Sequence, residues 1–327
     1  MNGAVNEAAH GPVNGAATTA LDGPTTAARE RRGFCLGVLG VTIFALTLPM
    51  TRLAVGDVSS PQLPPAFVTA GRAALAGIFS IAYLLWAGAA WSVRPARRHW
   101  RALLVCAVGT VVGFPLFLAL ALREVDAMHG AVVTGVLPLG TAVAAALLTR
   151  QRASLAFWVC ALIGCALVLA FAAMQGGGAL SAADGLLLLA VASASVGYVA
   201  GARVSASMPA EHTICWVLVL SLPLTLPATL WAWPATTASA AAWGGFLYVA
   251  VFSMWLGFFA WYRALSLGGV MRVSQVQLLQ PFLTLLFAAA LLGERLELVT
   301  VGFALAVVAI VFVGKKLPVA TTAKENR

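Results

Sequence analysis

The chain has 327 residues, of which 61% are hydrophobic and only 9% are charged. Soluble globular domains carry about 25% charged residues, so this composition excludes a soluble globule and predicts a polytopic membrane protein. The formal net charge is +9. Because the basic residues form short clusters at the ends of apolar stretches rather than one basic face, the charge argues for membrane topology and against a nucleic-acid partner.

The N-terminal region before the first apolar stretch is rich in Ala, Gly, Thr and Asn. It lacks the apolar core of a signal peptide. We therefore expect residues 1–33 to form a disordered cytoplasmic tail.

Ten apolar stretches follow, each about long enough to cross the bilayer. They cover residues 34–51, 65–87, 102–121, 130–148, 154–173, 184–202, 213–232, 243–262, 270–292 and 297–314. We expect two repeats of five spans, at 34–173 and 184–314, and a cytoplasmic C-terminal tail at 315–327. Because five is odd, the second repeat must enter the membrane in the opposite orientation. The predicted fold class is an all-α membrane protein of ten transmembrane helices in two inverted five-helix repeats, an organisation typical of secondary transporters.

The basic residues predict the orientation. Most of the 20 Lys and Arg residues lie at the ends of spans on one side, whereas Arg52, Arg123 and Arg295 lie on the other. By the positive-inside rule the richer side is cytoplasmic, so both termini are expected in the cytoplasm and the chain in the inner (cytoplasmic) membrane.

The two halves share a sequence pattern. In each, a span ends in Ala-Leu, the next span carries a proline (Pro138 and Pro281), and a charged corner precedes the last span. The motif from Pro281 through Gly293-Glu294-Arg295-Leu296 to Gly302 resembles the hallmark of the EamA family of the drug/metabolite transporter superfamily. The resemblance covers nearly the whole chain after residue 33. It implies an exporter of amino acids and other small metabolites, with helices 1, 3, 4, 6, 8 and 9 around a central cavity.

The first repeat departs from this motif. It has Arg150-Gln151-Arg152 where the second has Gly293-Glu294-Arg295. We interpret Glu294 and Arg295 as a structural corner, in which Glu294 complements the positive end of the last helix. The alternative is a ligand for the substrate or a proton.

Arg72 is the most informative polar residue inside a span, because every polar group in hydrocarbon needs a partner. Two interpretations stay open. The guanidinium snorkels to the headgroups or braces two helices, or it faces the cavity and pairs with an anionic group such as a carboxylate.

The ninth span is the most polar. Ser274, Gln277, Pro281 and Thr284 recur at helical spacing, with Gln280 beside them. Such residues form hydrogen bonds between helices or a cavity wall in which Pro281 frees a backbone carbonyl. We favour the cavity wall.

Further candidates complete an amphiphilic cavity that suits an amino acid or another small organic metabolite. The predicted substrate-binding residues are Arg72, Thr47, Phe117, Thr134, Tyr198, Trp255, Tyr262, Gln277 and Gln280. The predicted helix breaks or gates are Pro49, Pro115, Pro138 and Pro281. Small-residue pairs, among them Gly109 with Gly113 and Gly197 with Gly201, predict close helix contacts within the chain, with a homodimer face as the alternative.

No Asp or Glu lies deep inside a span, so no mid-membrane carboxylate is predicted for proton exchange. Glu124, Asp126 and His129 either titrate in coupling or are solvated turn residues; the coupling ion, with a proton as a candidate, stays open. The cysteines and histidines lack metal-ligand spacing, and no Gly-rich phosphate loop occurs. We therefore expect no metal, no cofactor and no enzymatic activity. The leading hypothesis is a secondary exporter of amino acids or related metabolites; the alternatives are an exporter of drug-like or other organic solutes and a non-transporting scaffold.

Overall fold

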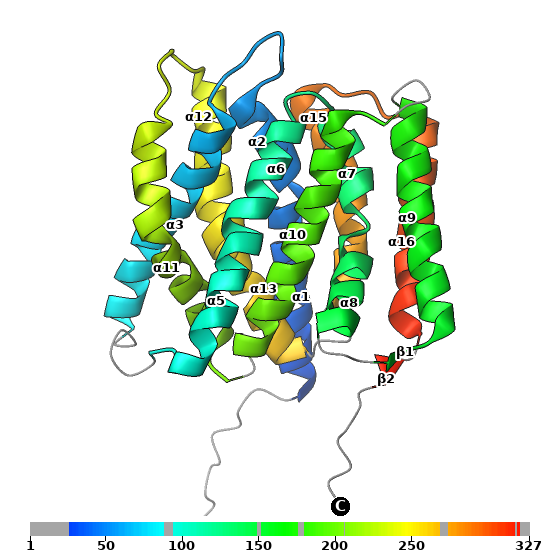
Figure 1. Ribbon diagram of the computed structural model, residues 1–327, viewed down its shortest axis with the longest axis horizontal. Coiled ribbons are helices and arrows are strands. Elements are labelled where there is room, and N and C mark those ends of the chain that lie inside the picture. Colours follow the sequence, from blue (N-terminus) through cyan, green and yellow to red (C-terminus); the bar gives the residue numbers. More distant parts are fainter. Residues whose placement is uncertain are drawn as a thin grey trace, which may run out of the picture.

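The computed structural model describes residues 26–87, 94–148, 152–175, 180–205, 207–268, 274–317 and 319–320. Residues 1–25 and 321–327 of the two predicted tails lie outside the described residues. The described chain is a bundle of helices that run roughly side by side (Figure 1).

The first half contains five helical runs. They are α1 (Thr26–Ala45) with α2 (Thr47–Val55); α3 (Pro65–Trp86); η1 (Arg97–His99), α5 (Trp100–Cys106), the π-helix η2 (Ala107–Gly113) and α6 (Phe114–Ala121); α7 (Ala127–Thr134) with α8 (Leu137–Leu148); and α9 (Leu155–Gln175). The first and fourth runs are interrupted near their middle.

The second half also contains five helical runs. They are α10 (Ala182–Ser205); α11 (Ala210–Trp231); α12 (Ala240–Leu247), the π-helix η3 (Tyr248–Leu256) and α13 (Gly257–Gly268); the 3₁₀-helix η4 (Ser274–Leu279) with α15 (Gln280–Leu292); and α16 (Leu298–Lys316). Each predicted span overlaps one of these runs, although residues 270–273 of the ninth span are outside the described residues.

The outer surface of the bundle is apolar. Eight helical runs in the described residues are long and apolar enough to cross a membrane, and two apolar helices, Val276–Leu292 and Leu298–Gly314, are shorter. Large side chains such as Leu155 (81% exposed) and Leu298 (90% exposed) point away from the protein. Soluble monomers do not expose apolar surface on this scale. The chain is therefore a multi-pass helical membrane protein, whereas the count of ten spans and the inversion of the repeats stay predictions.

The connections gather at the two ends of the bundle. We call the end that carries residues 56–64, 122–126, 232–239 and 293–297 the outer end, after the predicted orientation, and the opposite end the inner end. At the inner end, where α1 also begins, β1 (Arg152–Ala153) pairs antiparallel with β2 (Val319–Ala320) (Figure 1). This short pair was not predicted, and it joins part of the expected C-terminal tail to the corner after α8.

Close packing joins the halves at a glycine seam. A Cβ atom on Gly109 would lie 2.5 Å from the carbonyl oxygen of Ser193 and 2.8 Å from the Cα atom of Gly197. Only glycine fits this crossing of η2 with α10, because any side chain at Gly109 would force the helices apart. This seam agrees with the interpretation of these glycines as contacts within the chain.

Candidate functional site

The break in the first helical run exposes backbone carbonyl groups in the interior of the bundle. Proline has no N–H, so Pro49 cannot donate to the carbonyl of Ala45 four residues before it. The hydroxyl of Thr284 on α15 instead lies 2.9 Å from that carbonyl oxygen. The hydroxyl of Tyr248 on η3 donates to the nearby carbonyl of Ile43, at 3.1 Å. The second half of the chain thus satisfies the carbonyls that the break frees in the first half.

Ser253 connects this break to Arg72. Its hydroxyl oxygen accepts a hydrogen bond from Nη2 of Arg72 at 3.0 Å and lies 2.8 Å from the hydroxyl oxygen of Thr47. Ser253 is 3% exposed and Thr47 is 5% exposed. Ser253 belongs to η3, and π-helical segments of this kind are frequent at functional sites. We call Thr47, Arg72, Tyr198, Ser253 and Thr284 the polar centre.

Arg72 is buried and lacks a counter-ion. Its residue exposure is 3%, so the side chain does not snorkel to the membrane surface. Nε is buried without a hydrogen-bond partner. Among the described residues, no carboxylate lies within ion-pair distance of the guanidinium. The phenol of Tyr198 on α10 interacts with it electrostatically. The centre therefore holds a cation whose protein partners are neutral.

The remaining predicted substrate-binding residues lie apart from these contacts. Trp255 packs among aromatic rings, with centroids 5.1 Å from Phe259 and 5.5 Å from Phe79. The hydroxyl of Thr134 donates to the carbonyl of Gly130 in its own helix, at 2.7 Å. Phe117, Gln277 and Gln280 are partly exposed, and Tyr262 lies in α13, with its side chain outside the described residues. Among the side chains that the structure describes, Thr47, Arg72 and Tyr198 of the predicted set come together.

The predicted prolines follow irregular helix geometry. Pro49 lies in the first turn of α2, and Pro138 is the second residue of α8. Pro115 follows the π-helix η2, and Pro281 follows the 3₁₀-helix η4. Each proline removes the hydrogen bond that would have continued the preceding turn. Helical runs are interrupted near Pro49 and Pro138, whereas the runs through Pro115 and Pro281 continue past a π-helix and a 3₁₀-helix. The roles of all four prolines as helix breaks or gates stay predictions.

Glu294 caps a different helix from the one expected. Gly293 ends α15 with φ of 70°, a left-handed conformation that favours glycine, and turns the chain into the corner. The Glu294 carboxylate then accepts hydrogen bonds from the backbone N–H groups of Ala127 and Met128, both at 2.8 Å. These groups begin α7. The carboxylate thus reaches across the outer end to the fourth helical run, whereas the expectation that Glu294 complements the last helix stays a prediction.

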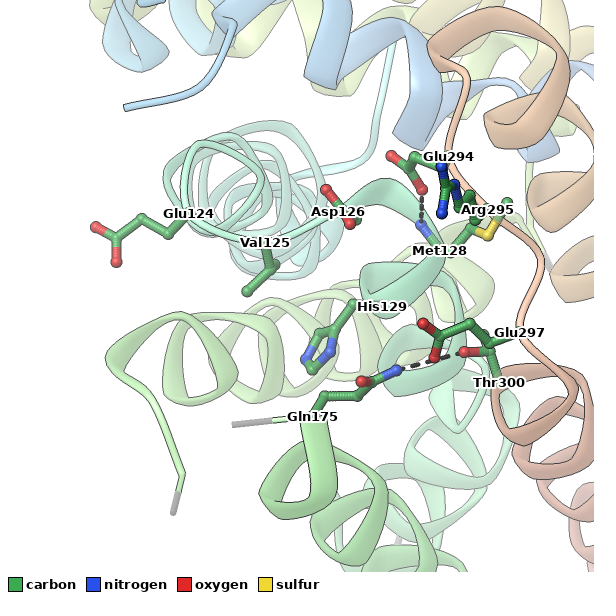
Figure 2. A pocket seen from close by; sticks show the side chains of 10 residues that line it. All are labelled: Glu124, Val125, Asp126, Met128, His129, Gln175, Glu294, Arg295, Glu297 and Thr300. Atoms are coloured by element: carbon green, nitrogen blue, oxygen red, sulfur yellow. Dashed lines mark hydrogen bonds between the residues drawn. The ribbon is translucent and has the colours of Figure 1, made fainter. Parts of the chain in front are cut away.

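A pocket of about 250 Å³ opens beside this corner (Figure 2). It is lined by Glu124, Val125, Asp126, Met128, His129, Gln175, Glu294, Arg295, Glu297 and Thr300. Burial raises the pKa of the Glu294 carboxyl, although its two N–H donors act in the opposite direction. Arg295 lies in the corner and lines this pocket, so the predicted structural corner is also the wall of an outer pocket.

Sequence reasoning missed Ser253 and Tyr248. Both are single polar groups in an apolar run, and a lone serine or tyrosine there carries no signal of its partner. The sequence also does not predict the π-helix that contains them, because one extra residue in a helical turn leaves the hydrophobic pattern almost unchanged.

The comparisons with known proteins agree with this architecture. The model of the EamA-like transporter family matches the chain twice, at residues 31–172 and 181–314. The uncharacterized transporter YdeK of Bacillus subtilis (strain 168) is 40% identical over 284 residues, which cover 86% of this chain and 96% of YdeK. A solved structure described only as the crystal structure of a protein is similar in fold, with a TM-score of 0.58 and 18% identity, covering 87% of this chain and 97% of that one. The chain belongs to the EamA-like transporter family of the drug/metabolite transporter superfamily.

Proposed function

We propose that the protein is a secondary exporter of amino acids or related small metabolites that carry a carboxylate, and that Arg72 binds this carboxylate. The single observation that carries the proposal is the buried guanidinium, which has no acidic partner in the part of the chain that the structure describes. A charge in a low-dielectric interior is costly unless it is paired. A substrate anion supplies the missing charge.

The position of Arg72 supports a transport role. Ser253 and Thr284 belong to the second family segment, whereas Thr47 and Arg72 belong to the first. A ligand held by Arg72 therefore lies where the two segments meet. In alternating access, which we propose for this chain, one repeat rocks against the other around such a site.

The chemistry around Arg72 favours a small polar anion over a drug-like cation. The guanidinium attracts anions and repels cations, and arginine binds carboxylates through two parallel hydrogen bonds. Hydroxyl groups of Thr47 and Ser253 next to it are suited to further polar groups of the ligand.

The test is exchange of radiolabelled amino acids by the full-length protein in liposomes, using all twenty amino acids as probes. We expect at least one to exchange above empty liposomes. Arg72→Gln should reduce that exchange by a factor of about 10–100, because hydrogen bonds to charged groups contribute about 1.5–3 kcal/mol.

A matched control separates the site from general charge effects. Arg101 is an exposed arginine on α5 near the inner end, so Arg101→Gln removes the same charge outside the polar centre and should leave exchange within about twofold of wild type. Exchange of no amino acid by the wild-type protein, or equal loss in both variants, contradicts the proposal.

A further inference from the structure

A histidine and an aspartate form a buried pair at the outer end. Nε2 of His129 on α7 lies 2.6 Å from Oδ1 of Asp184 on α10, and their side chains are 10% and 3% exposed. The other carboxylate oxygen accepts hydrogen bonds from the backbone N–H and the hydroxyl of Ser181, at 2.8 and 2.7 Å. Three donors converge on one carboxylate, which favours its ionised form, and Nε2 of His129 must carry a proton to donate.

This pair joins the two halves of the transporter. His129 belongs to the family segment 31–172 and Asp184 to the segment 181–314. The contact from Glu294 to the start of α7 crosses the same boundary. Titratable side chains therefore hold the halves together at the outer end, and separation of the halves would break both contacts.

The pair is open to protons from the outer end. His129 lines the outer pocket and lies on its wall with Gln175 (Figure 2). On α9 the ring of Phe171 lies 5.2 Å from the imidazole, centroid to centroid. The charged groups at the outer end around His129 are Arg52, Arg123, Glu124, Asp126, Asp184, Glu294, Arg295 and Glu297. Acids outnumber arginines in this set, and such a field concentrates cations, protons included.

We propose that His129 and Asp184 form a proton-binding site that closes the outer end of the transporter. An external proton converts the imidazole to an imidazolium, and the hydrogen bond to Asp184 becomes an ion pair between the halves. Because this ion pair exists only while the outer end is closed, proton binding and closure favour each other. The inference adds a regulatory site to the proposed transport function, and its structural part does not depend on which substrate is carried.

Glu294 acts in the same direction. Burial raises the pKa of its carboxyl in the closed conformation, so the closed conformation binds this proton more tightly than an open one in which the carboxyl is hydrated. External acid thus favours closure through both groups.

The test measures closure directly, without a substrate. Ala288 on α15 is 0% exposed and packs in the core that α15 shares with the first half. We place a cysteine at this position in the full chain in liposomes and measure its labelling by a membrane-impermeant maleimide, with mass spectrometry to identify residue 288. A second variant carries the cysteine at the exposed pocket position Glu297 instead. Its labelling rate at each pH corrects for the pH dependence of the maleimide reaction itself.

We expect corrected labelling of residue 288 to be at least about fivefold slower at an external pH of about 5.5 than at about 7.5. In a Glu294→Gln background, which removes the contribution of that carboxyl, His129→Gln keeps a hydrogen-bond donor but cannot become charged, so it should abolish this difference, and so should Asp184→Asn. Glu124→Gln, a matched change in an exposed acid of the same pocket, should preserve it.

The outcomes separate this inference from the proposed function. Equal labelling of the otherwise wild-type chain at both pH values overturns the proton site, as does a pH difference that persists in both pair variants. If the pH difference is present while no amino acid exchanges, the proton site stands and the proposed substrate class is wrong. If amino acids exchange but labelling shows no pH difference, the proposed substrate class stands and the proton site is wrong.

Discussion

Nη2 of Arg72 donates to the hydroxyl oxygen of Ser253 at 3.0 Å, across 181 residues of sequence. This bond fixes a buried cation beside the break between α1 and α2, because the same hydroxyl lies 2.8 Å from that of Thr47. The polar centre is therefore a contact between the two family segments, and any motion of one segment against the other must change it.

Ser253 should determine the position of the guanidinium. We expect Ser253→Ala to weaken amino-acid binding by about tenfold, because a hydrogen bond to a charged group contributes about 1.5–3 kcal/mol and part of it is regained through reorientation. Binding to the purified protein by isothermal titration calorimetry measures this change. Ser221→Ala is the control, since the hydroxyl of Ser221 donates within its own helix, to the carbonyl of Val217 at 2.7 Å. Similar losses in both variants would argue against the role of Ser253.

Thr284 and Pro49 should be energetically coupled. The Thr284 hydroxyl is shared between the carbonyls of Ala45 and Gln280, both at 2.9 Å. Thr284→Val removes this donor and should cost about 1 kcal/mol of unfolding free energy. In a Pro49→Ala background the new backbone N–H can serve the carbonyl of Ala45, so the same substitution should cost less, with a coupling energy of about 0.5 kcal/mol or more. The free energies of unfolding in detergent of wild type, the two single variants and the double variant form a double-mutant cycle, which measures this coupling energy.

Thr229→Val is the matched substitution for this cycle. The hydroxyl of Thr229 donates to the carbonyl of Thr225 in its own helix, at 2.6 Å. It should show no coupling to Pro49→Ala. Strictly additive effects of Thr284→Val and Pro49→Ala contradict the assignment of the Thr284 hydroxyl to the freed carbonyl.

Glu294 should make stability depend on pH. Its pKa is raised above the ordinary 4.5 by burial, so the folded protein binds this proton more tightly than the unfolded chain. The resulting stabilisation is fully present below pH 4.5 and is lost as the pH rises through the raised pKa. Thermal unfolding in detergent should therefore show a falling Tm over this window.

Glu294→Gln should flatten this dependence because the amide does not ionise. Glu297→Gln, an exposed acid of the same corner, should leave the slope unchanged. A wild-type slope that survives Glu294→Gln assigns the pH dependence to another group.

Local patterns predict the helices well. Apolar runs of about 20 residues and prolines inside them are properties of neighbouring residues, so the predicted spans overlap the observed helical runs and the prolines lie next to irregular helix geometry. The pattern around Pro138 recurs around Pro281, and the family model likewise matches the chain twice, whereas the predicted bounds of the two repeats stay predictions.

Contacts between distant residues could not be predicted in the same way. Glu294 and Ala127 are 167 residues apart, and their hydrogen bond depends on how α15 and α7 pack. The sequence identifies Glu294 as a corner but not the helix that it caps. Asp184 likewise counts only as an acid near a span end until the fold brings it to His129.

The most direct test of the account is ligand discrimination by Arg72. Binding of an amino acid found in the exchange assay is compared with binding of the amine that lacks only its carboxylate, by calorimetry on wild type, Arg72→Gln and Arg101→Gln. We predict that wild type and Arg101→Gln bind the amino acid at least about tenfold more tightly than the amine, a difference of about 1.4 kcal/mol, and that Arg72→Gln loses this preference. Equal preference for the carboxylate in Arg72→Gln and wild type would contradict the central claim.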